Sequence, residues 1–140
     1  MPNDETELLL AFIGEILESD TRYPIENTLL YAEVEPGMVS ASVFKDDGTS
    51  AVYRWVYSDR LIEALQDLWD AADPEKRWAE MEYVIRNNSF HAHFTFADEI
   101  DKDEDEFERR ARIVKRYFGD KPIAYPSWPP PSPPCREFEP

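Results

Sequence analysis

Two strand-like runs joined by a short polar turn constrain the fold of this chain most strongly. The runs cover residues 78–86 and 90–97, and the turn between them reads Asn-Asn-Ser. Aromatic residues lie on one face of the second run, whereas His91 and His93 lie on the other. Alternation of this kind is typical of a half-buried strand. We therefore predict an antiparallel strand pair in this part of the chain.

The rest of the chain adds helices and three further strands. Helices are expected where apolar residues recur every three or four positions, and strands where they alternate. The helical segments are 4–18, 58–72 and 104–118, and the further strands are 28–34, 38–44 and 50–56. The predicted order is α-β-β-β-α-β-β-α. We expect an α+β fold with an antiparallel sheet of about five strands and the helices packed on one side of it.

The chain is predicted to divide into one domain and a tail. Residues 1–120 carry all the expected helices and strands, as in a single domain of ordinary size. Residues 121–140 are rich in proline, which precludes a helix or a central strand, so we expect a tail that is partly docked or flexible. The single cysteine, Cys135, lies in this tail and cannot form an internal disulfide.

The charge of the chain indicates what it binds. Thirty acidic and fifteen basic residues give a formal net charge of −15. Such a surface repels nucleic acid and anionic lipid, but it attracts basic proteins. Acidity that serves solubility alone is the other interpretation. The acidic start of the chain, residues 1–5, is unlike a secretory signal and no run is apolar enough to span a bilayer, so a cytoplasmic location is predicted.

Catalytic motifs are missing from the sequence. The four glycines are isolated, so there is no glycine-rich phosphate loop, and no nucleophile-elbow pattern occurs. We therefore predict that the chain is not an enzyme and needs no cofactor. His91 and His93, with Glu80 or Glu82 on the neighbouring strand, keep a small metal-dependent enzyme open as an alternative, although no clear third ligand is present.

The densest run of charge is the strongest candidate for a binding surface. Residues 98–106 contain seven acids and one lysine, and such a run must be solvated. It is either a solvated loop that charges the start of the next helix favourably or a docking surface for a basic partner. The candidate partner-binding residues are Asp98, Glu99, Asp101, Asp103, Glu104, Asp105 and Glu106, with Asp46 and Asp47 as additions.

The second half of the chain resembles a known family. The stretch from Trp78 to Phe90 (WAEMEYVIRNNSF), followed by Phe-Thr-Phe, an acidic loop, Glu-Arg-Arg and Tyr-Phe-Gly, is similar to the YezG-like immunity proteins. The resemblance covers mainly residues 78–122. It implies an antitoxin of bacterial competition that neutralises a secreted polymorphic toxin, in many cases a nuclease, by direct binding. It transfers no list of partner contacts and leaves the oligomeric state open.

Three functions follow from these observations. The leading prediction is an immunity protein that forms a stoichiometric complex with a basic toxin domain. The first alternative is an acidic adaptor or DNA mimic that occupies the nucleic-acid site of another protein. The second alternative is the metal-dependent enzyme that would use His91 and His93.

Overall fold

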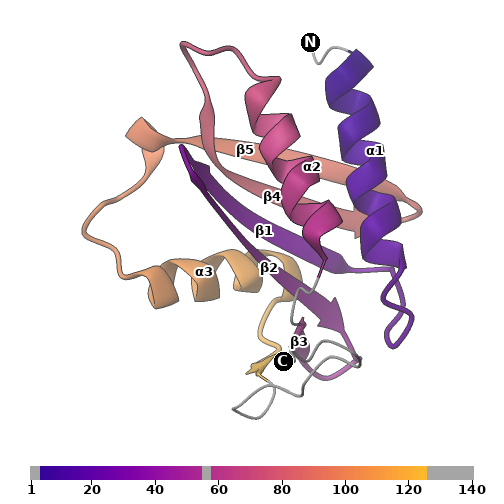
Figure 1. Ribbon diagram of the computed structural model, residues 1–140. Coiled ribbons are helices and arrows are strands. Elements are labelled where there is room, and N and C mark those ends of the chain that lie inside the picture. Colours follow the sequence, from indigo (N-terminus) through magenta and orange to yellow (C-terminus); the bar gives the residue numbers. More distant parts are fainter. Residues whose placement is uncertain (1–3, 55–57, 126–140) are drawn as a thin grey trace, which may run out of the picture.

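The protein is a three-layer α+β structure. The computed structural model describes residues 4–54 and 58–125. Six strands form one sheet in the order β5-β4-β1-β2-β3-β6. Helices α1 and α2 lie side by side on one face of the sheet, and α3 lies on the opposite face (Figure 1). The elements are α1 (Asp4–Glu18), β1 (Thr28–Glu35), β2 (Met38–Asp46), β3 (Ala51–Arg54), α2 (Asp59–Asp70), β4 (Trp78–Arg86), β5 (Ser89–Phe96), the short 3-10 helix η1 (Ala97–Glu99), α3 (Glu106–Phe118) and β6 (Ile123–Ala124).

The ends of the helices and the tight turns follow local sequence. Ser58 caps α2 by accepting a hydrogen bond from the backbone N–H of Leu61, and Asp105 caps α3 in the same way. Gly119 ends α3 at a φ of +66°, which glycine adopts easily. Asn87 and Asn88 both have positive φ, as expected for a two-residue turn that joins twisted antiparallel strands.

Each face of the sheet has its own apolar core. Alternate residues of β1 point to opposite faces, so Leu30 belongs to the core beneath α1 and α2, whereas Leu29 belongs to the core beneath α3. Both residues are fully buried. A β-bulge between Trp78 and Glu80 shifts the alternation of β4, so Trp78 joins the α1–α2 core while Glu80 faces α3.

Two expectations about the sheet were wrong. The helices cover both faces, because β1 is apolar on both sides and needs cover on each. The sheet also has a sixth strand, β6, which pairs with β3 in parallel and comes from the segment assigned to the tail. The order of the other helices and strands along the chain and the α+β class agree with the prediction. Residues 55–56 of the predicted third strand and residues 126–140 of the tail, with Cys135, lie outside the described residues.

Gly14 allows α1 to approach the sheet closely. The Tyr83 hydroxyl donates a 2.6 Å hydrogen bond to the Leu10 carbonyl, and a β-carbon on Gly14 would lie 2.8 Å from that hydroxyl. We expect Gly14→Ala to destabilise the protein by about 1–3 kcal/mol through overpacking, despite the better helix propensity of alanine.

The matched background is Tyr83→Phe, which removes the obstructing oxygen. In that background Gly14→Ala should be neutral or stabilising. Free energies of unfolding from denaturant titrations of the four proteins measure this coupling. Equal effects of Gly14→Ala in both backgrounds would refute the proposed contact.

Candidate functional site

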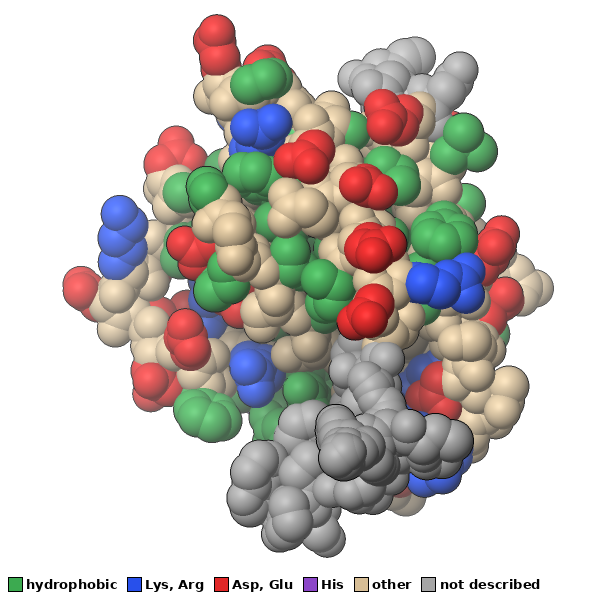
Figure 2. All heavy atoms as spheres, in the orientation of Figure 1, with side chains coloured by type: hydrophobic (Ala, Val, Ile, Leu, Met, Phe, Trp, Pro, Cys, Tyr) green, Lys and Arg blue, Asp and Glu red, His purple; other side chains and the backbone are tan. Residues whose placement is uncertain are grey.

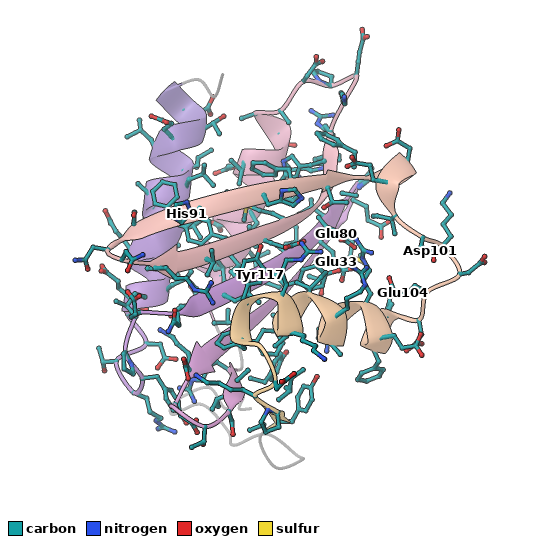
Figure 3. The ribbon with its side chains drawn as sticks, turned by 180° about the vertical axis from the view of Figure 1, so that it is seen from behind. Glu33, Glu80, His91, Asp101, Glu104 and Tyr117 are labelled. Carbon is teal, nitrogen blue, oxygen red and sulfur yellow. The ribbon has the colours of Figure 1, made fainter. Side chains whose placement is uncertain are left out.

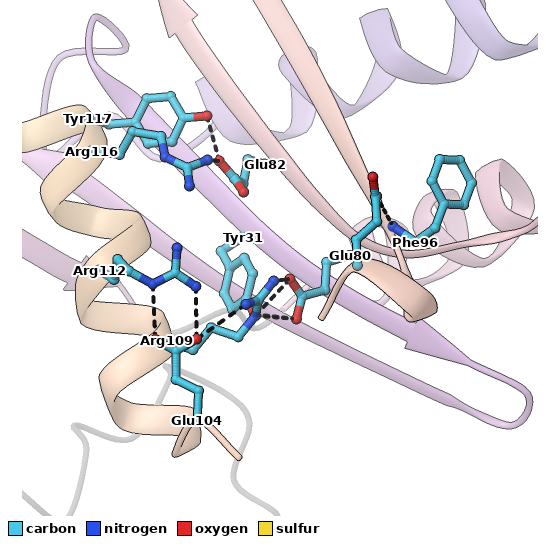
Figure 4. A network of polar contacts seen from close by, with 10 residues as sticks. Tyr31, Glu80, Glu82, Phe96, Glu104, Arg109, Arg112, Arg116 and Tyr117 are labelled. Carbon is cyan, nitrogen blue, oxygen red and sulfur yellow. Dashed lines mark hydrogen bonds and ion pairs between the residues drawn. The ribbon is translucent and has the colours of Figure 1, made fainter. Parts of the chain in front are cut away.

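A buried ion pair joins α3 to the sheet. The Arg109 guanidinium binds both oxygens of the Glu80 carboxylate, at 2.5–3.0 Å, and the Tyr31 hydroxyl donates to the same carboxylate at 2.8 Å (Figure 4). The Glu80 side chain is only 4% exposed. Burial, together with the Glu80 carboxylate, raises the pKa of Tyr31, so its hydroxyl stays protonated and donates. The negative charge of Glu80 is therefore fully partnered within the protein.

A second carboxylate, Glu82, repeats the arrangement two residues further along β4. It accepts hydrogen bonds from Arg116 at 2.8 Å and from the Tyr117 hydroxyl at 2.7 Å (Figure 4). Burial and this bond to Glu82 raise the pKa of Tyr117 to about 12. Residues two apart on a strand share a face, so Glu80 and Glu82 present a row of buried acids to α3.

Two bases of α3, Arg109 and Arg116, reach the acids of β4, whereas Arg112 and Lys115 are exposed. Helical spacing in the sequence predicts Phe107, Ala111, Val114 and Phe118 as the buried face of this helix. Val114 and Phe118 are buried as predicted, together with Ile113, but Phe107 and Ala111 are exposed. Because Arg109 and Arg116 pair with the buried carboxylates of Glu80 and Glu82, these two pairs add little net positive charge to the outer surface.

The acidic run 98–106 connects β5 to α3, and four of its carboxylates have structural partners. Glu99 accepts from the backbone N–H of Phe96, and Asp101 accepts from that of Asp103. Asp105 caps α3. Glu104 binds Arg109 and Arg112, and the hydrogen bond from Arg112 holds the pKa of Glu104 below its usual value. Figure 3 shows Asp101 on the loop and Glu104 where the loop meets α3.

The other three carboxylates of the run point into solvent. Among the described residues, Asp98, Asp103 and Glu106 have no hydrogen-bond or ion-pair partner, and all three are exposed. Phe107 follows directly and is 70% exposed. Arg110 lies near one face of its ring, 5.7 Å from the ring centroid. An exposed aromatic ring thus lies beside unpartnered acids, as in a typical binding hot spot.

Asp46 and Asp47 lie at the other end of α3. Asp46 binds Lys121, which follows the C-terminal end of the helix, and this contact lowers the pKa of Asp46. Asp47 accepts hydrogen bonds from the backbone N–H groups of Thr49 and Ser50, which lower its pKa. The structure therefore does not bring these two residues together with the acidic run, whose last residues begin α3.

The α1–α2 face carries a further group of acids that the sequence analysis did not single out. Figure 2 shows acidic side chains spread over this face. On α2 they recur at helical spacing on the solvent side, as exposed Asp59, Glu63, Asp67 and Asp70. Their spacing of three or four residues could have identified them, because it places side chains on one face of a helix.

His91 is exposed on the α3 side of β5 (Figure 3), and His93, two residues further along the same strand, is exposed on the same side. The carboxylates that were considered as additional metal ligands, Glu80 and Glu82, are occupied by Arg109 and Arg116. Within residues 4–54 and 58–125, no group of three or more His, Cys, Asp or Glu side chains is arranged to hold a metal ion. The geometry gives the metal-dependent alternative no third ligand in this region.

Glu33 is the least well compensated carboxylate beneath α3. Partial burial raises its pKa, and the nearby carboxylates of Glu80 and Glu106 raise it further, while Arg110 opposes them. A raised pKa in the folded state means that this group favours folding when protonated. That contribution is present below the ordinary glutamate pKa and is lost as the pH rises through the raised value.

Glu33→Gln should therefore be more stable than the wild type at neutral pH. The expected gain is less than about 1 kcal/mol, because the side chain is half-exposed and water screens it. The gain should disappear toward about pH 4, where the wild-type carboxyl is protonated. Thermal unfolding at both pH values measures it, and Glu35→Gln on the same strand, at an exposed position, is the control expected to show no gain.

Comparison with known proteins assigns no function. No protein-family model matches the chain, and no curated protein matches it. None of the helices that the structure describes is long and apolar enough to span a lipid bilayer.

Proposed function

We propose that this chain is an immunity protein that binds and neutralises a cognate toxin of bacterial competition. The toxin is a basic domain, and a nuclease is the leading candidate. The immunity protein holds it in a stoichiometric complex in the cytoplasm. The immunity protein uses no cofactor and catalyses no reaction. The resemblance of residues 78–122 to YezG-like immunity proteins supports this assignment.

One structural observation carries the proposal: Arg109 and Arg116 of α3 pair with buried acids of the sheet, whereas three acids of the run beside this helix have no partner. Arg109 and Arg116 neutralise buried Glu80 and Glu82. The free carboxylates of residues 98–106 and the acids of α2 remain outside. The resulting negative field attracts a basic surface and accelerates encounter with it.

The acidic run and Phe107 have different parts in this binding. The free carboxylates Asp98, Asp103 and Glu106 pair with lysine and arginine side chains that the toxin would otherwise use on phosphates. Phe107 supplies apolar contact that water cannot reach once the complex has formed. Charge thus sets the rate of association, and the aromatic contact slows dissociation.

Co-expression tests the proposal. A candidate toxin is first sought in the reading frames next to the gene, as a protein that ends in a basic domain. That domain is tagged and expressed with this chain, and the captured material is weighed by native mass spectrometry. We expect a one-to-one complex that dissociates as the salt concentration rises. Capture of the tagged domain alone, at low salt and with both chains soluble, would count against an immunity function.

A second candidate function is favoured by the row of acids along α2. Asp59, Glu63, Asp67 and Asp70 form a linear array of carboxylates, as expected of a DNA mimic or an acidic adaptor. A DNA mimic should displace duplex DNA from several unrelated DNA-binding proteins. An immunity protein should leave them unaffected and act only on its own toxin, so a competition assay with such proteins separates the two.

A further inference from the structure

The outer edge of β5 is open. β5 is the first strand of the sheet, and no other described strand pairs with its outer side. Its eight residues, SFHAHFTF, contain no lysine, proline or acid. Natural edge strands are usually protected by such residues, by bulges or by a covering segment, because an open edge readily pairs with another chain.

The hairpin geometry identifies the backbone groups that are free. Ile85 directs its carbonyl away from β5, because it accepts a hydrogen bond from Asn27 beside β1. In an antiparallel ladder, successive residues direct their N–H and C=O groups to opposite neighbouring strands. Val84 and Glu82 therefore direct these groups to β5. Their partners there are His91 and His93. Phe90, Ala92 and Phe94 therefore direct their N–H and C=O groups outward.

Phe96 is the next residue of β5 whose N–H group should point outward, and its hydrogen bond agrees with this direction. The N–H of Phe96 is bound by the Glu99 side chain at 2.9 Å, which closes the edge at its C-terminal end. The free ladder thus extends over Phe90, Ala92 and Phe94, which is room for a short added strand.

An apolar groove runs beside the same edge on the helix side. Its volume is about 380 Å³, and Leu10, Leu68, Trp78, Phe90 and Phe94 contribute to its walls. A strand added to β5 would place alternate side chains over this groove, as in other cases of strand addition.

The charges around the edge favour a basic occupant. Asp98 and Glu99 follow its C-terminal end, where Lys76 lies 5.0 Å from the centroid of the Phe96 ring. Glu15, Glu18 and Glu26 surround a second hollow next to Phe90 at the other end, so acids outnumber bases around the edge. A second copy of this chain would bring two such acidic sets together, in addition to its net charge of −15. The field therefore disfavours self-association and favours lysine or arginine on both sides of the added strand.

We propose that β5 binds an extended segment of a basic protein by strand addition at Phe90, Ala92 and Phe94. The segment alternates apolar and polar residues, its apolar side chains enter the groove, and its flanking basic residues contact the acids at both ends. This inference deepens the proposed function and rests on it for the identity of the natural partner, which would be the toxin.

Amide exchange measured by NMR on the full-length chain tests the proposal without the toxin. The probe is a synthetic peptide of ten residues, in which six alternating valines and threonines are flanked by two lysines at each end. It is added at millimolar concentration and low salt. We expect exchange at Phe90, Ala92 and Phe94 to be fast in the free protein and to slow at least about tenfold with the peptide. The His91 and His93 amides are internal controls, because their bonds to β4 already protect them.

Two variants and a second peptide sharpen the test. Ala92→Pro removes one outward N–H and should abolish the protection at Phe90 and Phe94, whereas Ala92→Ser keeps the N–H and should retain it. If Ala92→Pro fails to fold, the wild-type exchange data still decide. A peptide with glutamates in place of the lysines should give no protection.

Several results would overturn the proposal. One is that the lysine peptide leaves amide exchange at Phe90, Ala92 and Phe94 unchanged, and another is that the glutamate peptide protects these amides equally well. A third is that the amides are already protected in the free chain, whether sedimentation shows it to be a monomer or a dimer. Failure of toxin capture together with peptide protection would refute the immunity function alone. Capture of the toxin with these amides still exchanging fast would refute the strand addition alone.

Discussion

Arg109→Met should lower the free energy of unfolding by about 3–5 kcal/mol, since removal of one partner leaves a buried charge uncompensated. The Glu80 carboxylate, 4% exposed, would retain only the Tyr31 hydroxyl. A loss of this size is a large fraction of the stability of an ordinary domain and corresponds to a melting temperature lower by roughly 10–20 °C. Denaturant titration and calorimetry measure both quantities.

Two comparisons separate burial from charge as the cause. Arg112→Met removes an arginine whose side chain is 49% exposed, so it should cost far less. The double variant Glu80→Met with Arg109→Met replaces the whole pair by apolar groups and should recover much of the stability. A loss for Arg109→Met no larger than that for Arg112→Met would contradict the assignment of this pair as a buried link between α3 and the sheet.

Replacing the three free acids of the run should slow association with a basic partner by about tenfold at low salt. The variant is Asp98→Asn, Asp103→Asn and Glu106→Gln, which leaves the structural carboxylates Glu104 and Asp105 intact. The association rate should also depend less on salt, because fewer charges contribute to steering. Stopped-flow or surface binding measurements with the co-expressed toxin domain report both effects.

The matched control changes the net charge equally at another place. Asp59→Asn, Glu63→Gln and Asp67→Asn on α2 remove three exposed acids from the opposite layer. Phe107→Ser keeps every charge and should accelerate dissociation while leaving association almost unchanged. If the α2 variant slows association as much as the loop variant does, the field acts as a whole and residues 98–106 are not its centre.

The sequence predicted the elements well because their patterns are local. Ser58, Asp105 and Gly119 lie at helix ends, where short-range hydrogen bonds and positive φ decide the boundary. The alternation in β5 also placed His91 and His93 on one face correctly. The placement of α3 was missed, since periodicity defines a helix face but not the layer that it covers. The continuous apolar run in β1 could have indicated cover on both sides.

The candidate site was predicted less completely. Helical periodicity predicted Val114 and Phe118 correctly as buried residues of α3, but it also favoured Phe107 and Ala111, which are exposed. It did not predict that Arg109 and Arg116 contact Glu80 and Glu82 of the sheet. Glu80 and Glu82, two acids at alternate positions of the otherwise apolar strand β4, could have indicated that basic side chains cover this face. Strand β6 is two residues long and follows a proline, so no local pattern could identify it. The separation of Asp46 and Asp47 from residues 98–106 depends on tertiary structure alone.

Growth of bacteria that produce the candidate toxin domain is the most direct test of the central claim. The toxin is induced in cells that carry this chain, the loop variant with neutral residues at 98, 103 and 106, or an empty vector. The account predicts full growth with the wild-type chain, no growth with the vector, and weaker protection by the variant. Arrested growth with the wild-type chain, present as soluble protein at least equal in amount to the toxin, would contradict it.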